Sequence, residues 1–171
     1  MSSSQLPLLE NATRDLAQFA AVLRYEDIPR KAVECIKLSV LDSIGCCLFG
    51  ATLPWTRKVS ALAEDEGARP VASLMGMGRK SSVSLAVLVN STAGHAFELD
   101  DIHKESIVHP GSLAMPVAMA YAEAAGGAPG RDVITAMIAS ASSTWWAFRR
   151  RRAACRRSRC PSTSTRTASC T

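Results

Sequence analysis

The three histidines of this chain all lie in one short acidic segment, "HAFELDDIHKESIVHPGS", at residues 95–112. The same segment holds four carboxylates, Glu98, Asp100, Asp101 and Glu105. Imidazole exchanges protons near neutral pH, and a neighbouring carboxylate can orient it or exchange a proton itself. The segment therefore indicates an acid–base catalytic site, a metal site, or a polar loop between two helices.

His109 has the most informative context, because "HPGS" comes immediately before an alanine-rich segment that is expected to be a helix. The free N–H groups and partial positive charge of a helix N-terminus favour an uncharged imidazole and attract an anionic substrate. We predict that His109 takes a proton from a carbon next to a carboxylate, and that Asp101 orients the imidazole or returns a proton. Four further residues are predicted to contact the substrate: Glu98, Asp100, His103 and Ser112.

Two alternatives remain for the same segment. His103 and His109, with one of the two neighbouring aspartates, are acceptable ligands for zinc or iron. However, the segment contains no H-x-x-x-H or H-E-x-x-H spacing, so we predict no metal and no cofactor. His95 is expected to be a structural histidine on a helix, and Lys104 and Glu105 are expected to be solvated loop charges.

Hydrophobic spacing predicts an all-α helical bundle. The helices are expected over residues 13–24, 30–51, 54–66, 82–101 and 112–125, and from residue 130 onward. The fourth of these is apolar nearly all round in its first half, which predicts a central, buried helix. If it continues to Asp101, then His95 and Glu98 lie beside that residue on the helix surface.

The residue pattern also predicts which side chains are buried, where one helix begins and which segment is extended. The second helix is expected to bury six apolar residues: Val33, Ile36, Val40, Leu41, Ile44 and Leu48. Ser112 is expected to cap the fifth helix, which would place Pro116 in its first turn, where a missing N–H costs little. Residues 70–76, "PVASLMG", are short and apolar and are expected to form an extended connector.

The chain has 171 residues and a net charge of +5, but the charge is unevenly distributed. Eight of the 20 basic residues lie from Arg149 onward, which leaves 12 bases against 15 acids in the remainder. The body is therefore not a nucleic-acid binder on grounds of charge. Together with an apolar fraction of 47%, this predicts one domain over residues 1–140, followed by a distinct tail over residues 141–171.

The tail is rich in Arg, Ser, Thr and Cys and has no hydrophobic period. Coding DNA read in a shifted frame fits this composition best, and a disordered tail or a nucleic-acid-binding arm are the alternatives. The sequence shows no secretion signal and no run of apolar residues long enough to span a bilayer, so we expect a cytoplasmic protein without membrane contact.

The segment "HAFELDDIHKESIVHPGS", preceded by "VLVNSTAG", resembles the MmgE/PrpD family. The helix "AVECIKLSVLDSIGCCLFGA" resembles the start of that family, and the similarity covers about residues 10 to 140. By motif position, Glu98 matches the first acid of the turn, Asp101 its last Asp, and His109 the histidine of the HPG or HPS motif. Ile102 stands where a Thr commonly follows the Asp pair.

This resemblance implies a helical N-terminal domain of a metal-free lyase or isomerase that acts on small polycarboxylates, usually as a homodimer. It also implies that a second domain and further catalytic histidines and a lysine lie beyond this chain. We therefore expect this polypeptide to be truncated and inactive alone, with uncovered apolar surface on the fifth helix. A helical scaffold module and a nucleic-acid binder with a basic tail are the alternatives from other classes.

Overall fold

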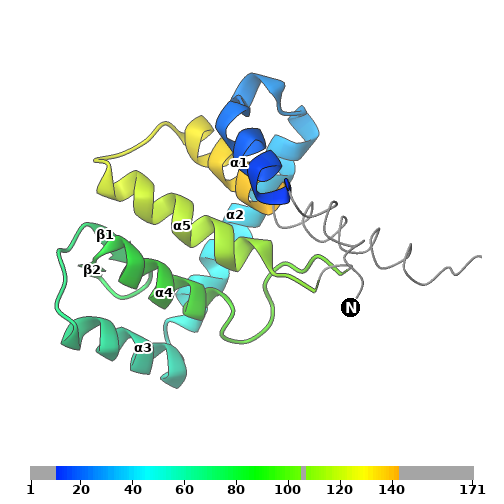
Figure 1. The fold of residues 1–171 in the computed structure, drawn as a ribbon. Helices are drawn as coiled ribbons and strands as arrows, with labels where there is room; N and C mark the ends of the chain where they lie inside the picture. The colour runs from blue at the N-terminus through cyan, green and yellow to red at the C-terminus, as the bar shows by residue number, and fades with distance from the viewer. Residues whose placement is uncertain (1–10, 105–106, 143–171) are drawn as a thin grey trace, which may run out of the picture.

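The computed structural model describes residues 11–104 and 107–142, and Figure 1 shows how they are arranged. Helices make up most of this part: α1 (Ala12–Val22), the 3-10 helix η2 (Tyr25–Asp27), α2 (Arg30–Gly50), α3 (Pro54–Asp65), α4 (Val83–Gly94), α5 (Pro110–Ala124) and a last helix over residues 130–142. A small antiparallel hairpin joins α3 to α4 and consists of β1 (Ala72–Leu74) and β2 (Arg79–Ser81). The predicted helical fold is confirmed, and β1 occupies the segment expected to be extended.

Helix α4 is the centre of the domain. It contacts α2, α3, α5 and both strands, and Figure 1 shows it between α3 and α5. Its sequence "VSLAVLVNSTAG" carries no charge, and Ala86, Val89 and Ala93 are fully buried. Ser82 caps its start by accepting a hydrogen bond from the Leu85 N–H. The prediction of a central, buried helix is confirmed.

Small residues allow α2 and α4 to pack closely. A Cβ atom at Gly50 would lie 1.9 Å from the carbonyl oxygen of Ala93, so only glycine fits at this crossing. Nearby, the Cys47 thiol donates to the Asn90 carbonyl oxygen at 3.3 Å. This close approach brings the C-terminal halves of α2 and α4 together, next to the segment that carries the histidines.

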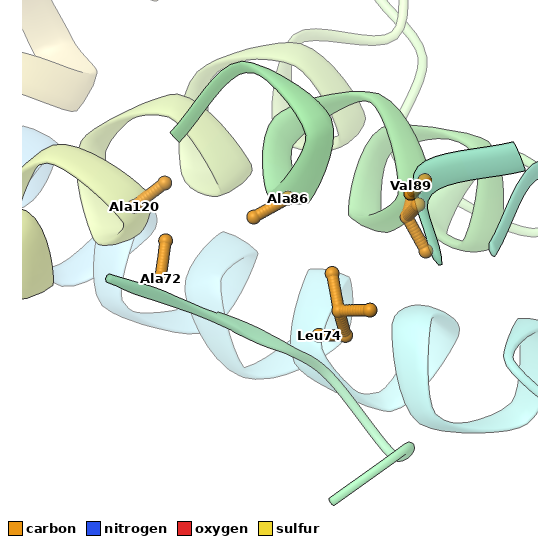
Figure 2. Packing of buried hydrophobic residues seen from close by; sticks show 6 residues of the cluster. Ala72, Leu74, Ala86, Val89 and Ala120 are labelled. Carbon is orange, nitrogen blue, oxygen red and sulfur yellow. The ribbon is translucent and has the colours of Figure 1, made fainter. Parts of the chain in front are cut away.

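The hairpin closes one side of the core. Figure 2 shows Ala72 and Leu74 of β1 packed against Ala86 and Val89 of α4 and Ala120 of α5. The buried side chain of Asn90 fixes this packing by accepting from the Met75 N–H at 2.9 Å and donating to the Ser73 carbonyl oxygen at 2.8 Å. A second buried cluster forms around residues from four helices: Cys47, Ala93, Met115 and Met137.

The predicted end of the fourth helix is wrong. α4 ends at Gly94, and residues 95–102 form turns and irregular backbone instead of a continued helix. The chain turns because Trp55 donates to the Ala96 carbonyl oxygen and because Asp100 reaches back to the His95 ring. These contacts require a reversal that a helix through Asp101 would not permit.

The predicted start of the fifth helix is also wrong. α5 begins at Pro110 with His109 as its N-cap residue, three positions before the expected cap at Ser112. Proline suits the first helical position, and a carboxylate of Asp101 supplies the acceptor that Ser112 was expected to provide. Pro116 consequently lies inside the helix, where its missing N–H removes a bond to the Ser112 carbonyl oxygen.

Helices α2 and α5 both carry exposed apolar side chains. Val33 of α2 is buried and Ile36, Val40 and Ile44 pack against the second cluster, but Leu41 and Leu48 are 69% and 51% exposed, contrary to prediction. On α5, an exposed apolar stripe repeats every four residues at Leu113, Val117 and Tyr121. The expected uncovered surface on this helix is therefore present.

Among the described residues, no helix has the length and apolar character needed to cross a bilayer. The predicted tail lies outside the described residues from residue 143 onward, and so does Glu105. The proposed division into a body and a tail therefore stays a prediction.

Candidate active site

The end of α4 and the start of α5 meet at the predicted site. His95 is the C-cap residue of α4 and His109 is the N-cap residue of α5. The two helices are close here, because a Cβ atom at Gly94 would lie 3.4 Å from the Cβ atom of Ser112. Two packed helix ends therefore hold the two imidazoles, whose ring centroids are 4.5 Å apart.

Asp100 lies between these two rings. Its carboxylate side chain is only 1% exposed, and its oxygens lie 3.1 and 3.2 Å from His95 Nδ1. Asp100 Oδ2 also lies 3.3 Å from His109 Nδ1. The site is therefore a compact group of two imidazoles around one buried carboxylate, which we call the His–Asp–His cluster (His95, Asp100 and His109).

The two imidazoles contact Asp100 differently. His95 forms a hydrogen bond with the carboxylate, and its side chain is about half exposed. His109 Nδ1 lies close enough for an electrostatic contact but is not aligned for a hydrogen bond, and it is a buried nitrogen without a hydrogen-bond partner among the described residues. Burying such a nitrogen without a partner has a cost, which a ligand or a transferred proton would relieve.

Asp101 serves a different part of the site from its neighbour. Its Oδ1 accepts a hydrogen bond from the Gly111 N–H at 2.8 Å, and its Oδ2 accepts one from the Ser39 hydroxyl of α2 at 3.3 Å. A carboxylate at this position accepts from a free N–H of the first turn and is stabilised by the positive end of the helix dipole. The structure thus places Asp100, and not Asp101, beside His109 Nδ1.

The other residues predicted to contact the substrate lie in different places in the structure. Ser112 is buried and donates its hydroxyl proton to the His109 carbonyl oxygen at 3.1 Å, so it lies next to the cluster. His103 pairs through its backbone with Val108, which closes the loop between the helices. Glu98 is exposed and has a positive φ of 53°, an uncommon conformation for a residue with a side chain.

A shallow cleft of about 660 Å³ opens beside the cluster. Both histidines and Ser112 lie in its wall, and the indole of Trp55 borders it while donating to the Ala96 carbonyl oxygen at 3.1 Å. The remaining lining residues come from α4, the loop and α5: Ser91, Thr92, Ala96, Ile107, Val108 and Leu113. A small polar molecule in this cleft would reach both imidazoles.

Two basic residues of β2 pair with carboxylates away from the His–Asp–His cluster. Arg79 forms an ion pair with Glu64, and Lys80 lies 3.8 Å from Glu123 near the end of α5. That end of α5 is about 20 Å from His109, since 14 residues of α-helix rise about 1.5 Å each. Lys104, in contrast, belongs to the loop that joins α4 to α5.

Two cysteines of α2 lie behind the cluster. Burial raises the pKa of the Cys47 thiol to about 12, and Cys46 and Asp100 add smaller contributions in the same direction. Burial also raises the pKa of Cys46, with smaller contributions from the nearby carboxylates. Since the thiolate is the nucleophilic form, neither thiol is suited to act as a nucleophile at neutral pH.

Sequence reasoning missed two parts of this site. His95 was expected to be structural, yet it contacts the same carboxylate as His109. Ser39 lies 62 residues from its partner Asp101, so no local pattern pointed to it. The five-residue spacing of His95 and Asp100 could have indicated a turn, because such a pair does not share one face of a helix.

One known protein family matches the part of the chain that holds this site. The family model of the MmgE/PrpD N-terminal domain matches residues 14–142, which include both helix ends and the loop between them. The chain belongs to the MmgE/PrpD family. The resemblance noted from the histidine-bearing segment is thereby confirmed.

Two curated proteins from fungi are similar to this MmgE/PrpD chain. It is 30% identical over 113 residues to the cis-aconitate decarboxylase-like protein oryM of Aspergillus oryzae. It is 32% identical over 111 residues to the cis-aconitate decarboxylase of Aspergillus terreus. These matches cover 66% and 65% of this chain but only 23% of each relative, so the similarity concerns one part of those longer proteins.

Proposed function

We propose that this chain is the helical part of a lyase that acts on small polycarboxylates by moving a proton at a carbon next to a carboxylate. The observation that carries the proposal is the His–Asp–His cluster, which is held at the N-terminus of α5 and borders the cleft. His109 is the proposed acid–base group. The similarity to cis-aconitate decarboxylase supports an unsaturated tricarboxylate as the first substrate to test.

The chemistry assigned to each residue follows from its contacts. His109 takes the proton from the substrate carbon, and the Asp100 carboxylate stabilises the positive charge that the imidazole gains. In a dehydration, His95, which shares that carboxylate, gives a proton to the substrate hydroxyl group as it leaves as water. In a decarboxylation the proton moves the other way, and a protonated imidazole gives it to the carbon that loses CO2. Asp101 acts as a positioning residue, because it holds the first turn of α5 and with it His109.

We also propose that these 171 residues have no turnover alone. The curated relatives extend far beyond the matched region, and the apolar stripe of α5 is a surface that further chain could cover. As parts of the same proposal, we infer that residues 141–171 come from a shifted reading frame, that the protein assembles as a homodimer and that it is cytoplasmic. Sequencing the locus and translating the region after codon 140 in all three frames tests the first of these, because a single intact frame without a plausible continuation would contradict it.

Binding to the short chain tests the site directly. We expect cis-aconitate to shift the imidazole resonances of His109 and His95 in NMR spectra, while those of His103 change much less. A His109→Ala variant should abolish the shift at His95, and the matched His103→Ala variant should retain it. If cis-aconitate at millimolar concentration leaves the spectrum unchanged, or shifts the three histidines equally, the assignment of the site is wrong.

Turnover tests the reaction in a chain with the frame restored. We expect release of CO2 or water from citrate-like acids, which His109→Ala should lower by at least about 100-fold, since general acid–base catalysis contributes 10²–10⁴-fold. The matched His103→Ala variant should retain activity within a few-fold. An unchanged rate in the His109→Ala variant would reject the role assigned to His109.

A further inference from the structure

The cleft beside the His–Asp–His cluster is lined partly by large apolar side chains. Trp55 of α3, Ile107 of the loop and Leu113 of α5 line it, and each of these residues is at least half exposed. We propose that this apolar lining (Trp55, Ile107 and Leu113) receives a hydrocarbon substituent of the substrate, and that Trp55 determines the specificity for it. The inference rests on the proposed function, because it concerns the substrate of the same site.

The polar groups of the cleft provide for few carboxylates. No lysine or arginine is among the described residues that line it. Thr92 and Ser112 already donate their hydroxyl protons to backbone carbonyl oxygens, which leaves the two imidazoles and the Ser91 hydroxyl as side-chain donors among these described residues. A carboxylate against the apolar lining would therefore lose its hydration without gaining a cation, whereas a hydrocarbon group would gain by leaving water.

Trp55 is held firmly enough to select a substituent by shape. It lies in the first turn of α3, and its neighbour Thr56 is fully buried. Its indole N–H, which is the only polar group of the ring, donates to the Ala96 carbonyl oxygen at 3.1 Å. The remaining surface of the ring is therefore hydrocarbon, and an aromatic ring gives a large contact area with little loss of side-chain entropy.

Ile107 reaches the cleft through an unfavourable backbone conformation. Its φ is 52°, which is rare for a β-branched residue. The residue is 78% exposed, so side-chain packing within the described part of the chain does not compensate for this conformation. Strained residues of this kind cluster at ligand-binding sites. A hydrocarbon group bound against Ile107 would cover its side chain and offset part of the strain.

The cleft has room for such a substituent. Its volume of about 660 Å³ is within the range of sites that hold drug-sized ligands, and it is more than a small dicarboxylate fills. Each CH2 group that moves from water onto apolar surface should raise the affinity by up to about fourfold. The gain in affinity with chain length therefore measures the contact between the substituent and the apolar lining.

Binding of alkylsuccinates to the whole 171-residue chain tests the proposal. Succinate, methylsuccinate, propylsuccinate and pentylsuccinate share two carboxylates and differ only in the hydrocarbon substituent. The Kd is measured from the NMR shifts of the His95 and His109 imidazoles. We expect it to fall by at least about threefold from methylsuccinate to propylsuccinate, and again to pentylsuccinate. Propane-1,2,3-tricarboxylate, which carries a carboxylate at the end of a short substituent, should bind more weakly than propylsuccinate.

Substitutions locate the contact. Trp55→Ala should reduce the gain from methylsuccinate to pentylsuccinate by at least about threefold, whereas Trp55→Phe, which keeps an apolar ring but loses the N–H, should retain most of it. Tyr121→Ala is the matched control, because Tyr121 is an exposed aromatic residue of α5 that lies about 12 Å along the helix from Leu113 and does not line the cleft. Leu113→Ala replaces Trp55→Ala if circular dichroism shows that the tryptophan variant has lost its helices.

Three outcomes would overturn the proposal and leave the site assignment intact. The first is a Kd that does not fall with chain length, although the acids shift both imidazoles. The second is an equal loss of the gain in Trp55→Ala and Tyr121→Ala, which would assign the gain to exposed apolar surface in general. The third is a Trp55→Phe variant that behaves like Trp55→Ala, which would assign the effect to the hydrogen bond. If none of the acids, cis-aconitate included, shifts either imidazole, the proposed function fails together with this inference.

Discussion

Asp101 should be among the most important residues for the stability of the site, although it does not contact the imidazoles in the cluster. Asp101→Ala removes the acceptor of the Gly111 N–H at 2.8 Å and of the Ser39 hydroxyl at 3.3 Å. Gly111 is buried, so its N–H would lose its partner in a place that water reaches poorly. The first turn of α5, with His109 as its N-cap residue, would then lose its hydrogen bond to the preceding loop and its link to α2.

The expected loss can be estimated from these contacts. Removing a helix N-cap costs about 0.5–2 kcal/mol, and a hydrogen bond to a charged group contributes about 1.5–3 kcal/mol. The two values describe largely the same interaction and do not add, so with the weaker Ser39 contact we expect about 2–3 kcal/mol. For a domain of this size the Tm should fall by about 10 °C. Asp101→Asn keeps an oxygen acceptor but loses the charge, and it should cost about half as much.

Urea unfolding followed by circular dichroism measures these losses. Asp42→Ala is the matched control, because Asp42 is an exposed aspartate of α2 and caps no helix. High salt should reduce the difference between Asp101 and Asp101→Asn, since it screens the charge–dipole part. If Asp101→Ala destabilises the chain no more than Asp42→Ala does, the described role of Asp101 at the start of α5 is wrong.

Three further predictions concern the core. Gly50→Ala should destabilise the fold by about 1–3 kcal/mol or more, because its Cβ atom would overlap the Ala93 carbonyl oxygen. Gly45→Ala, at a position with open space, should stabilise the fold slightly. Equal effects of the two substitutions in urea unfolding would contradict the close helix crossing. Asn90→Ala should cost about 2–4 kcal/mol by leaving two backbone groups of the hairpin segment unpaired, with faster hydrogen exchange in residues 72–81 as the readout. Burial raises the pKa of the Cys47 thiol to about 12 in the folded state, against a reference pKa of 9.0. The protonated thiol therefore contributes fully to the stability of the fold below pH 9, and this contribution is lost as the pH rises toward 12. By about pH 10.5 the loss should reach about 2 kcal/mol, and it should be absent in Cys47→Ala; an equal alkaline loss in that variant would refute it.

The central helix was predictable because its sequence alone decides where it must lie. A charge-free segment such as residues 83–94 is stable when most of its surface is covered, and the structure packs three helices and the hairpin against α4 and leaves Leu88 46% exposed. The family was recognisable for a different reason, since the acidic turn and the HPG motif occur together in the segment at residues 95–112.

The contacts of the two neighbouring aspartates could not be predicted from their positions. Adjacent residues in an irregular loop point in directions that the tertiary contacts decide. Here the deciding contact for Asp101 comes from Ser39 on α2, which the local sequence does not reveal. The same limit explains why α4 was extended too far, because Trp55 and Asp100 favour a turn where helical spacing suggested a continuation.

The apolar face of α2 was overestimated for another reason. Leu41 and Leu48 fit the helical spacing of the buried residues but are exposed, because the 21-residue helix has apolar side chains on more than one face. A hydrophobic period predicts which residues can be buried together. It does not say which of two apolar faces the rest of the chain will cover.

The division of labour between Asp100 and Asp101 makes the length of the connecting loop critical, even though surface loops generally tolerate insertions. Deleting one residue between His95 and Asp100 would shift both acids by one position in the register. Asp101 would then be moved toward the imidazoles, and the start of α5 would lose its anchor to α2. Variants that exchange loop residues should therefore be accepted far more readily than variants that lengthen or shorten the loop, so any redesign of this segment must preserve the residue count before the side chains.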